Sequence, residues 1–325
     1  METAISVRGL RKNYKTYKRE DGFLASVRSV IHRDFSTKEA LKGINFDIAK
    51  GEILGFIGPN GAGKSTAIKV LCGILHPTAG EVNSLGHTPW EDRINYAQKF
   101  GVVFGQKSQL DWDLPPNDTF HLIKALYGIP EAAFKRRLNY MVKLLNVEAI
   151  YKTPTRNLSL GERMKCEVIA ALLHNPKLVL LDEPTIGMDV VAKKKLHGFI
   201  KRINEKYNTT FIITTHDMGD IEKLCKRVII INNGDIVYDG LLEELKKKHI
   251  NNKLIEVKFE DKTRIRVPKR CKLISRTPYT LKFEVPVKGQ SLDKFVVDII
   301  KNYPVADIVI SDPPIEEIIR DIYQA

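Results

Sequence analysis

The stretch Ile53-Leu-Gly-Phe-Ile-Gly-Pro-Asn-Gly-Ala-Gly-Lys-Ser-Thr66 decides the fold of this 325-residue chain. It opens with a short apolar run that suits a buried strand. Gly58, Gly63, Lys64 and Ser65 then fit the phosphate-loop spacing G-x-x-x-x-G-K-[ST]. A helix-like segment that stops at a glycine follows. Strand, loop and helix in this order predict an α/β domain with a nucleotide site.

The loop carries specific chemistry. Glycines let backbone N–H groups converge on a phosphate, and a helix start adds partial positive charge. We expect Lys64 to neutralise phosphate oxygens and the Ser65 hydroxyl to bind Mg²⁺. A chance glycine-rich turn is the alternative, and the flanking strand and helix disfavour it. The residues expected to bind the nucleotide are Gly58, Pro59, Asn60, Gly61, Ala62, Gly63, Lys64, Ser65 and Thr66.

Two further apolar runs end in residues that suit phosphate hydrolysis. Leu178-Val-Leu-Leu-Asp182 indicates a central parallel strand whose carboxylate lies at the ligand-binding edge of the sheet. We expect Asp182 to hold Mg²⁺ and Glu183 to be the general base for the attacking water. The run Phe211–Thr215 leads to His216, which is placed to orient that water. Taken alone, each of these polar residues would fit an ordinary strand end. The presence of a phosphate loop in the same chain favours a catalytic role instead.

A second candidate phosphate binder lies far along the chain. Leu158-Ser-Leu-Gly-Glu162 precedes a helix-forming run, Met164–Leu173. The Ser159 hydroxyl and the first amides of that helix are donors for an anion. A phosphate-binding loop so far along the chain from the phosphate loop is expected to face the phosphate loop of a second copy of the chain. The sequence therefore predicts a protein that works as a pair.

Taken in order, the motifs resemble those of the ATP-binding subunit of ABC transporters over about residues 4–240. The matching segments are the Walker A loop 58–66, the Q-loop residue Gln106, the signature 158–162, the Walker B strand 178–183, the D-loop-like Gly187-Met-Asp189 and the switch residue His216. The resemblance implies a P-loop ABC ATPase core with a β-subdomain and a helical subdomain. It also implies that the cofactors are ATP and Mg²⁺.

The same resemblance assigns residues that the spacing alone does not. In this family ATP lies between two subunits, so Ser159 and Gly161 of one copy would cap the γ-phosphate bound by the other. Tyr14 would stack on the adenine. Gln106 would contact the nucleotide and Mg²⁺, although a lone glutamine is also an ordinary loop residue. The second nucleotide-binding subunit would be an identical chain or a close homologue.

The signature loop departs from the family pattern at two positions. Leu160 stands where the first usual glycine is found, and Glu162 replaces the usual glutamine. Glu162 suits the positive end of a helix but brings negative charge near a bound phosphate. Neither change removes a donor that the mechanism requires, so we expect hydrolysis to survive with Glu162 at the nucleotide.

Composition and sequence patterns exclude several classes of protein. No apolar run approaches the roughly 18–20 residues that span a bilayer, and no signal peptide opens the chain. We therefore expect a peripheral protein on the cytoplasmic face of the cell membrane, with transport through separate transmembrane permease subunits. The four cysteines lack metal-ligand spacing and indicate reduced thiols. Despite a net charge of +13, we expect no nucleic-acid partner.

Residues 15–38 are a basic insertion, where simpler relatives have a short turn. Apolar residues within it recur at helical spacing beside two arginines, namely Phe23, Leu24, Val27, Val30, Ile31, Arg28 and Arg33. The hypothesis is a basic amphipathic helix against anionic lipid or a membrane partner. An ordinary solvated surface is the alternative.

The domain assignment is an ATPase domain over 1–240 and an accessory or regulatory domain over 241–325. Within the first, 107–157 is the helical subdomain, with expected helices at Thr119–Tyr127 and Glu131–Leu145. The segment Gln109–Pro115 would supply part of a groove for the transmembrane subunit, with Trp112 either in the core or at that interface.

The tail predicts a small α+β domain. The expected elements are helices at Leu241–Lys248, Leu292–Asn302 and Ile315–Tyr323, a break at Asn251-Asn252, and strands at Leu254–Phe259, Arg264–Val267, Leu281–Val285 and Asp307–Ile310. Its ending, Asp312–Ile322, resembles the tails of bacterial ABC exporters with type-two permeases. A role in regulation or dimerisation and simple packing against the core both remain open.

The sequence thus predicts an ATPase subunit that drives export. An importer ATPase is the nearest alternative. A translation factor of the same superfamily usually carries two cassettes, and one phosphate loop exists here. A DNA-repair ATPase would place a heptad-rich insertion between Gln106 and Ser159, and no heptad run occurs there.

Overall fold

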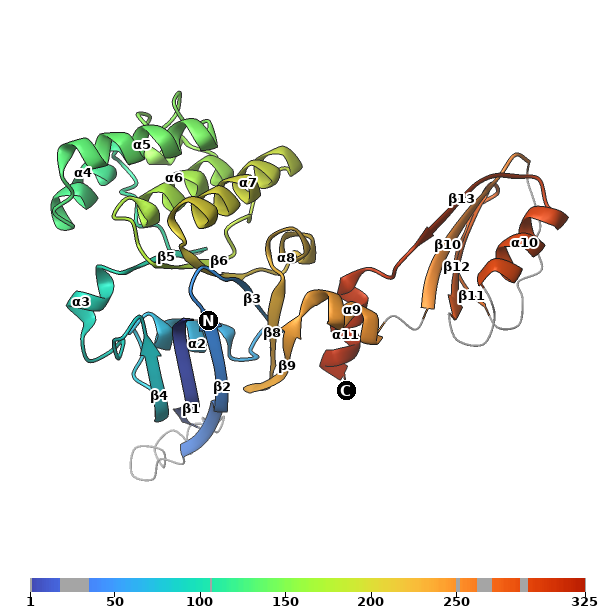
Figure 1. Ribbon diagram of the computed structural model, residues 1–325, viewed down its shortest axis with the longest axis horizontal. Helices are drawn as coiled ribbons and strands as arrows, with labels where there is room; N and C mark the ends of the chain where they lie inside the picture. The colour runs from blue at the N-terminus through green and yellow to red at the C-terminus, as the bar shows by residue number, and fades with distance from the viewer. Residues whose placement is uncertain are drawn as a thin grey trace, which may run out of the picture. The chain divides into compact units, whose positions relative to one another are not determined.

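The computed structural model describes residues 2–17, 35–105, 107–249, 252–261, 271–286 and 292–324. It divides into two compact units, Met1–Leu241 and Leu242–Ala325, and each is described by itself (Figure 1). Among the described residues, none of the helices combines the length and the apolar character needed to cross a membrane.

A six-stranded sheet forms the centre of the first unit, in the order β5-β6-β7-β3-β8-β9. Its strands are β3 Ile53–Ile57, β5 Phe100–Phe104, β6 Leu178–Asp182, β7 Thr210–Thr214, β8 Arg227–Asn232 and β9 Asp235–Leu241. All neighbours pair in parallel except β8 and β9. Parallel strands covered on both faces carry continuous apolar runs, as Phe211–Ile213 within the fully buried β7 illustrate. The expected α/β class is confirmed.

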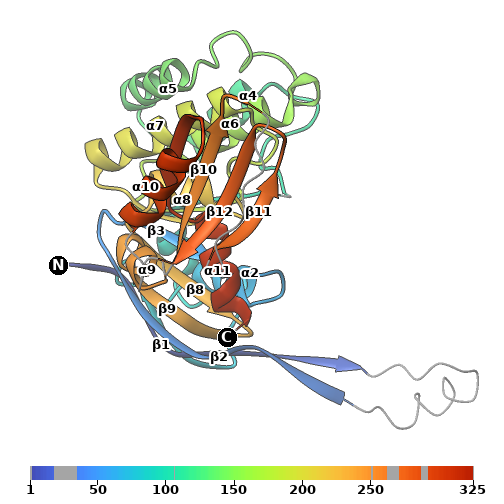
Figure 2. The ribbon, with the colours of Figure 1, turned by 90° about the vertical axis from the view of Figure 1, so that its right-hand side faces the viewer.

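A second, antiparallel sheet of order β2-β1-β4 belongs to the same unit. Its strands are β1 Thr3–Tyr17, β2 Phe35–Ala49 and β4 Ala79–Ser84, and Figure 2 shows β1 and β2 running side by side. Residues 15–17 and 35–38 of the basic insertion lie in these paired strands. The amphipathic segment Phe23–Ile31 and Arg33 lie outside the described residues.

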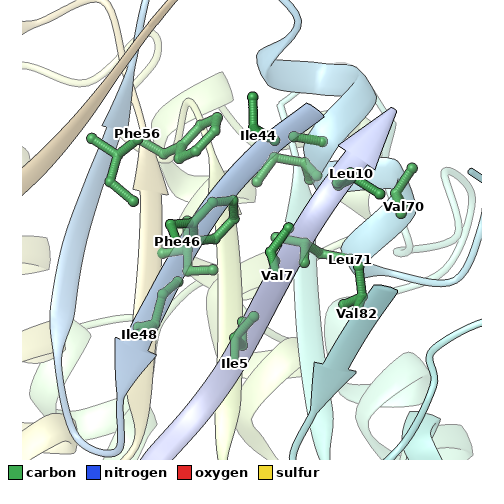
Figure 3. Packing of buried hydrophobic residues seen from close by; sticks show 14 of the residues in the cluster. Ile5, Val7, Leu10, Ile44, Phe46, Ile48, Phe56, Val70, Leu71 and Val82 are labelled. Carbon is green, nitrogen blue, oxygen red and sulfur yellow. The ribbon is translucent and has the colours of Figure 1, made fainter. Parts of the chain in front are cut away.

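The antiparallel sheet is held to the phosphate-loop helix by a shared apolar core. Alternate residues of β1, including Ile5 and Val7, face Phe46 of β2 and Leu71 of helix α2, Lys64–Leu71 (Figure 3). Phe46 also lies against Phe56 of β3, with ring centroids 6.0 Å apart. This packing fixes the phosphate loop relative to both sheets.

The remaining helices of the first unit are α3 Arg93–Ala97, α4 Pro116–Leu126, α5 Glu131–Leu145, α6 Leu160–Leu172, α7 Val190–Tyr207 and α8 Met218–Leu224, with a 3₁₀ turn at Thr155–Asn157. The predicted bounds of α5 are confirmed. The helix expected at Thr119–Tyr127 begins earlier, because Pro116 suits the first helical position, where its missing N–H has no partner to lose.

The second unit contains a four-stranded antiparallel sheet of order β11-β12-β10-β13. Its elements are α9 Leu242–His249, β10 Asn252–Phe259, β11 Lys272–Arg276, β12 Thr280–Pro286, α10 Leu292–Asn302, β13 Val305–Ser311 and α11 Ile315–Gln324. Helix α9 ends at His249 and β10 begins at Asn252, so the second residue of the expected break Asn251-Asn252 already belongs to the strand, and Asn251 lies outside the described residues. The strand expected at Arg264–Val267 lies outside the described residues.

Strand β11 was not expected. Its sequence, Lys272-Leu-Ile-Ser-Arg276, lacks regular alternation, and all but Leu273 are exposed. An edge strand of this kind gains its pairing from β12 rather than from its own pattern. Opposite it in the core, Phe283 of β12 meets Phe295 of α10 edge to face, with centroids 5.6 Å apart.

Candidate functional site

The phosphate loop joins β3 to α2 and passes close to neighbouring backbone. A Cβ on Gly58 would lie 2.3 Å from the carbonyl oxygen of Ile231, and one on Gly63 would lie 2.5 Å from that of Ala40. Gly63 also has φ +112°, which strains any residue with a side chain. Glycine is therefore required at both positions.

Lys64 is the first residue of α2, and its side chain folds back over the loop. Its Nζ donates to the carbonyl oxygens of Gly58 and of Pro59, the latter at 2.9 Å. Burial lowers the pKa of Lys64, and the charges of Glu183 and Asp182 oppose that shift. The charges of both carboxylates thus favour the protonated form of this side chain.

Tyr14 of β1 lies beside the start of α2. Its hydroxyl is 3.5 Å from Oγ1 of Thr66, and the Lys12 ammonium lies 5.5 Å from the centroid of its ring. The Tyr14 side chain is exposed. An exposed ring beside a phosphate loop offers a flat surface on which a base could stack.

The catalytic candidates meet at the ends of two neighbouring strands. The Thr214 hydroxyl at the end of β7 donates to Asp182 at the end of β6. The Glu183 N–H donates to the Thr214 carbonyl oxygen at 2.9 Å, and Glu183 itself has φ +55°. A non-glycine residue in this left-handed region is strained, and such strain concentrates at functional sites.

Glu183 and His216 are directly paired. His216 Nε2 lies 3.2 Å from Glu183 Oε1, and the His216 backbone N–H donates to Glu183 Oε2 at 3.4 Å. Burial raises the pKa of Glu183, and His216 opposes this shift. The structure thus brings Lys64, Asp182, Glu183 and His216 together at one edge of the sheet.

Gln106 lies outside the described residues. Its strand β5 pairs in parallel with β6, with Phe104 opposite Asp182. Asp182 and Ser65 supply oxygen donors of the kind Mg²⁺ takes when phosphate oxygens and water complete its shell. Within the described ranges no group of three or more His, Cys, Asp or Glu side chains could form a metal site by itself.

Ser159 is the N-cap of α6 and forms a capping box with Glu162. The Glu162 N–H donates to Ser159 Oγ at 3.3 Å, and Glu162 Oε2 accepts from the Ser159 N–H at 2.9 Å and from its hydroxyl at 2.8 Å. These bonds lower the pKa of Glu162. The hydroxyl expected to face an anion is therefore engaged within its own loop. The sequence pattern Ser-x-x-Glu could have indicated the capping box, but not this bond from the hydroxyl.

The signature loop packs on the segment that follows the Walker B strand. Gly187 has φ +69°, and a Cβ there would lie 2.4 Å from Cδ2 of Leu160. Gly161 is buried, and a Cβ on it would be 3.4 Å from the Gly187 carbonyl oxygen. Asp189 caps α7 by accepting the Ala192 N–H at 2.7 Å. In the described part of the chain no hydrogen bond joins Ser159 or Gly161 to the phosphate loop.

A buried network beneath the catalytic candidates was not predicted from the sequence. Asp220 of α8 accepts hydrogen bonds from the hydroxyls of Thr185 and Thr215, which lie close to Glu183 and His216 in the chain. His197 Nε2 of α7 lies 2.8 Å from the other Asp220 oxygen. The network fastens the turns that carry the two candidates, and only the packing of α7 on α8 reveals it.

Comparisons with known proteins place these motifs in one family. The family model described as ABC transporter matches residues 41–186. The linearmycin resistance ATP-binding protein LnrL of Bacillus subtilis is 31% identical over 215 residues, which are 66% of this chain and 68% of that protein. The methionine import ATP-binding protein MetN 2 of Enterococcus faecalis is 32% identical over 226 residues, which are 67% and 65%.

Solved structures share the fold. The post-hydrolysis dimer of the ATP-binding cassette MJ0796, bound to ADP and phosphate, has a TM-score of 0.60 at 24% identity. The match covers 73% of this chain and 98% of that one.

Proposed function

The chain belongs to the ATP-binding subunits of ABC transporters, and from this premise we propose that it drives export through separate transmembrane subunits. It is an ATPase that binds ATP and serves a transporter. The observation that carries the proposed chemistry is the pairing of Glu183 with His216 beside Lys64. A base held by a second group is the arrangement that water attack requires.

Each group in this cluster has a proposed role. Lys64 exchanges its carbonyl partners for the β- and γ-phosphate oxygens of ATP. Asp182 and Ser65 hold Mg²⁺, which neutralises phosphate charge when bound. Glu183 accepts the proton of the attacking water, and His216 keeps that carboxylate and the water in line. Tyr14 stacks on the adenine, and Gln106 contacts the nucleotide from its loop.

Two copies, or this chain and a close homologue, would close head to tail on ATP. The related cassette MJ0796 is dimeric, which supports this arrangement. Ser159 has one hydroxyl proton, so it must release Glu162 before it can donate to the partner's γ-phosphate. Closure therefore includes a switch in the bonding of Ser159.

Export is the proposed direction because the ending Asp312–Ile322 resembles the tails of bacterial exporters and LnrL is a resistance protein. Import, as in MetN 2, is the alternative. We place the subunit at the cytoplasmic face of the membrane, bound to its permease. The unit Leu242–Ala325 would regulate or strengthen the dimer. Transport by the co-purified permease in vesicles decides direction, and accumulation of substrate on the ATP side would overturn export.

Substitution of the proposed base tests the mechanism. Glu183→Gln should reduce turnover by at least about 10²-fold and still allow ATP to dimerise the subunit, because the amide keeps the shape of the carboxylate but accepts no proton. Glu162→Gln, which introduces the usual family residue, is the matched control and should retain turnover. A wild-type rate of ATP hydrolysis in Glu183→Gln would contradict the assignment of Glu183 as the general base.

Shared sites are tested by mixing two inactive variants. Lys64→Ala removes a phosphate-loop charge, and Ser159→Glu places a carboxylate at the signature. In a mixed dimer one site combines an intact phosphate loop with an intact signature, so part of the ATPase activity should return. A mixture as inactive as its components would count against composite sites.

A further inference from the structure

One carboxylate in the first unit breaks the usual rule for charged residues. Glu167 of α6 is only 4% exposed, and charged side chains are rarely so buried unless they are paired. In the described part of the chain no cationic side chain forms an ion pair with it. Burial raises the pKa of Glu167, and hydrogen bonds from Ser108 and Gln109 oppose that shift. Such a residue costs stability, which suggests that it serves another purpose.

The partners of Glu167 come from one short segment. The Ser108 hydroxyl donates to Oε1, and the Gln109 N–H donates to Oε2 at 3.2 Å. The Gln109 side-chain amide donates in turn to the Glu167 carbonyl oxygen at 3.1 Å. We call residues 108–115 the strap. Its first residues are thus bound to the middle of the signature helix by both carboxylate oxygens.

The rest of the strap is bound to the residues around the signature loop. The Arg163 guanidinium carbon lies 5.6 Å from the centroid of the Trp112 ring. The Arg156 N–H donates to the Trp112 carbonyl oxygen, and the Thr155 N–H to that of Leu114, both at 3.0 Å. The strap therefore follows the signature region from just before Ser159 to Glu167.

At its other end the strap is continuous with the nucleotide site of its own subunit. Strand β5 ends at Phe104, which pairs with Asp182, and the Lys107 N–H donates to the Phe104 carbonyl oxygen at 3.2 Å. A displacement at the end of β6, where Asp182 is proposed to hold Mg²⁺, can thus be transmitted to the strap over a short distance through β5 and the bond between Phe104 and Lys107. Glu167 is where this route enters α6.

We propose that Glu167 is a positioning residue that makes the strap and the signature helix move as one body and thereby couples the two ATP sites of a dimer. The inference rests on the proposed function, in which β6 serves the ATP of its own subunit and Ser159 the ATP of the partner. Occupation of one site then biases the signature that closes the other. The observable consequence is positive cooperativity in ATP hydrolysis, with a Hill coefficient above 1.

Two substitutions in the 325-residue chain test how strongly the coupling between the ATP sites depends on Glu167. Glu167→Gln keeps the shape but leaves a single acceptor oxygen for two donors. Glu167→Leu removes both acceptors. The Hill coefficient should fall part of the way in Glu167→Gln and approach 1 in Glu167→Leu, while the Kd for ATP of the isolated subunit changes by less than about twofold, since no ATP contact is removed.

Stability distinguishes coupling from a structural role. In Glu167→Gln the loss of a buried charge offsets the donor that is left unpaired, so its unfolding midpoint in urea should fall by no more than that of the control below while its cooperativity falls. Ser84→Ala is the matched control: it removes the buried 3.0 Å bond between Ser84 and Tyr96, away from the strap. It should lower the midpoint and leave the Hill coefficient unchanged.

The outcomes separate this inference from the proposed function. If wild type neither hydrolyses ATP nor dimerises with it, the proposed function fails. If wild type hydrolyses ATP cooperatively and both Glu167 variants keep the full Hill coefficient, the inference fails alone. A loss of cooperativity in Ser84→Ala equal to that in Glu167→Gln would also overturn it.

Discussion

Gly187 lies beneath Leu160, and replacing it with alanine measures how firmly the signature loop is packed on the next segment of its own subunit. At φ +69° an L-residue costs about 1–2 kcal/mol relative to glycine. The new Cβ would lie 2.4 Å from Leu160 Cδ2, so the leucine must move, and overpacking of this kind costs about 1–3 kcal/mol. Gly187→Ala should therefore destabilise the first unit by roughly 2–5 kcal/mol.

A second substitution separates the two contributions. Leu160→Gly removes the overlapping side chain, so Gly187→Ala in that background should cost only the backbone strain of about 1–2 kcal/mol. The coupling free energy between the two positions should then be about 1–3 kcal/mol. Gly198→Ala is the control, because Gly198 lies within α7 with nothing within 4 Å of an added Cβ, and it should be neutral or stabilising.

Urea unfolding followed by tryptophan fluorescence is the assay. The only tryptophans of the chain, Trp90 and Trp112, both lie in the first unit, so the signal reports on that unit. Trp112 lies against Arg163 of α6, close to the perturbed loop. Additive effects, with a coupling below about 0.5 kcal/mol, would refute the packing of Leu160 on Gly187.

Three further results are expected. Burial raises the pKa of Glu183, so the folded protein binds the proton of this carboxyl group more tightly than the unfolded chain does. The unfolding free energy of wild type relative to Glu183→Gln should therefore fall as the pH rises through the range in which carboxyl groups titrate. A rise in this difference would contradict the direction of the pKa shift. Chelation of Mg²⁺ with EDTA should abolish hydrolysis and leave the urea midpoint unchanged, and persistent turnover would contradict the proposed role of Asp182. Phe283→Ala, at a fully buried position, should cost the second unit about 3–5 kcal/mol. Hydrogen exchange should then rise in residues 252–324 alone, and an equal rise in the first unit would contradict separate cores.

Local sequence patterns were sufficient to predict a structural element where the periodicity and the terminating residues lie within the segment itself. Helix α5 runs over Glu131–Leu145 as expected, since its apolar residues follow the helical period and Asn146 ends it in the left-handed conformation. The phosphate loop is equally local, because its glycines, lysine and serine are consecutive along the chain. Strand β11 lacks such signals and forms through its neighbour.

Bounds and bonding partners were less predictable than the elements themselves. The capping box of Ser159 and Glu162 is written in the sequence, yet its consequence, an engaged hydroxyl, became evident only from the bond lengths. Glu167 has no local signal at all, since a glutamate in a helix is ordinarily exposed.

The sequence by itself determined the class of the first unit, the order of its motifs and the chemistry they can perform, because those properties depend on residue type and on spacing along the chain. Tertiary structure decided which of these groups meet. The pairing of Glu183 with His216 depends on β6 and β7 being neighbours in the sheet, and the burial of Glu167 depends on the strap folding across α6. Contacts between residues distant in the chain are set by how whole elements pack, and no local pattern encodes them.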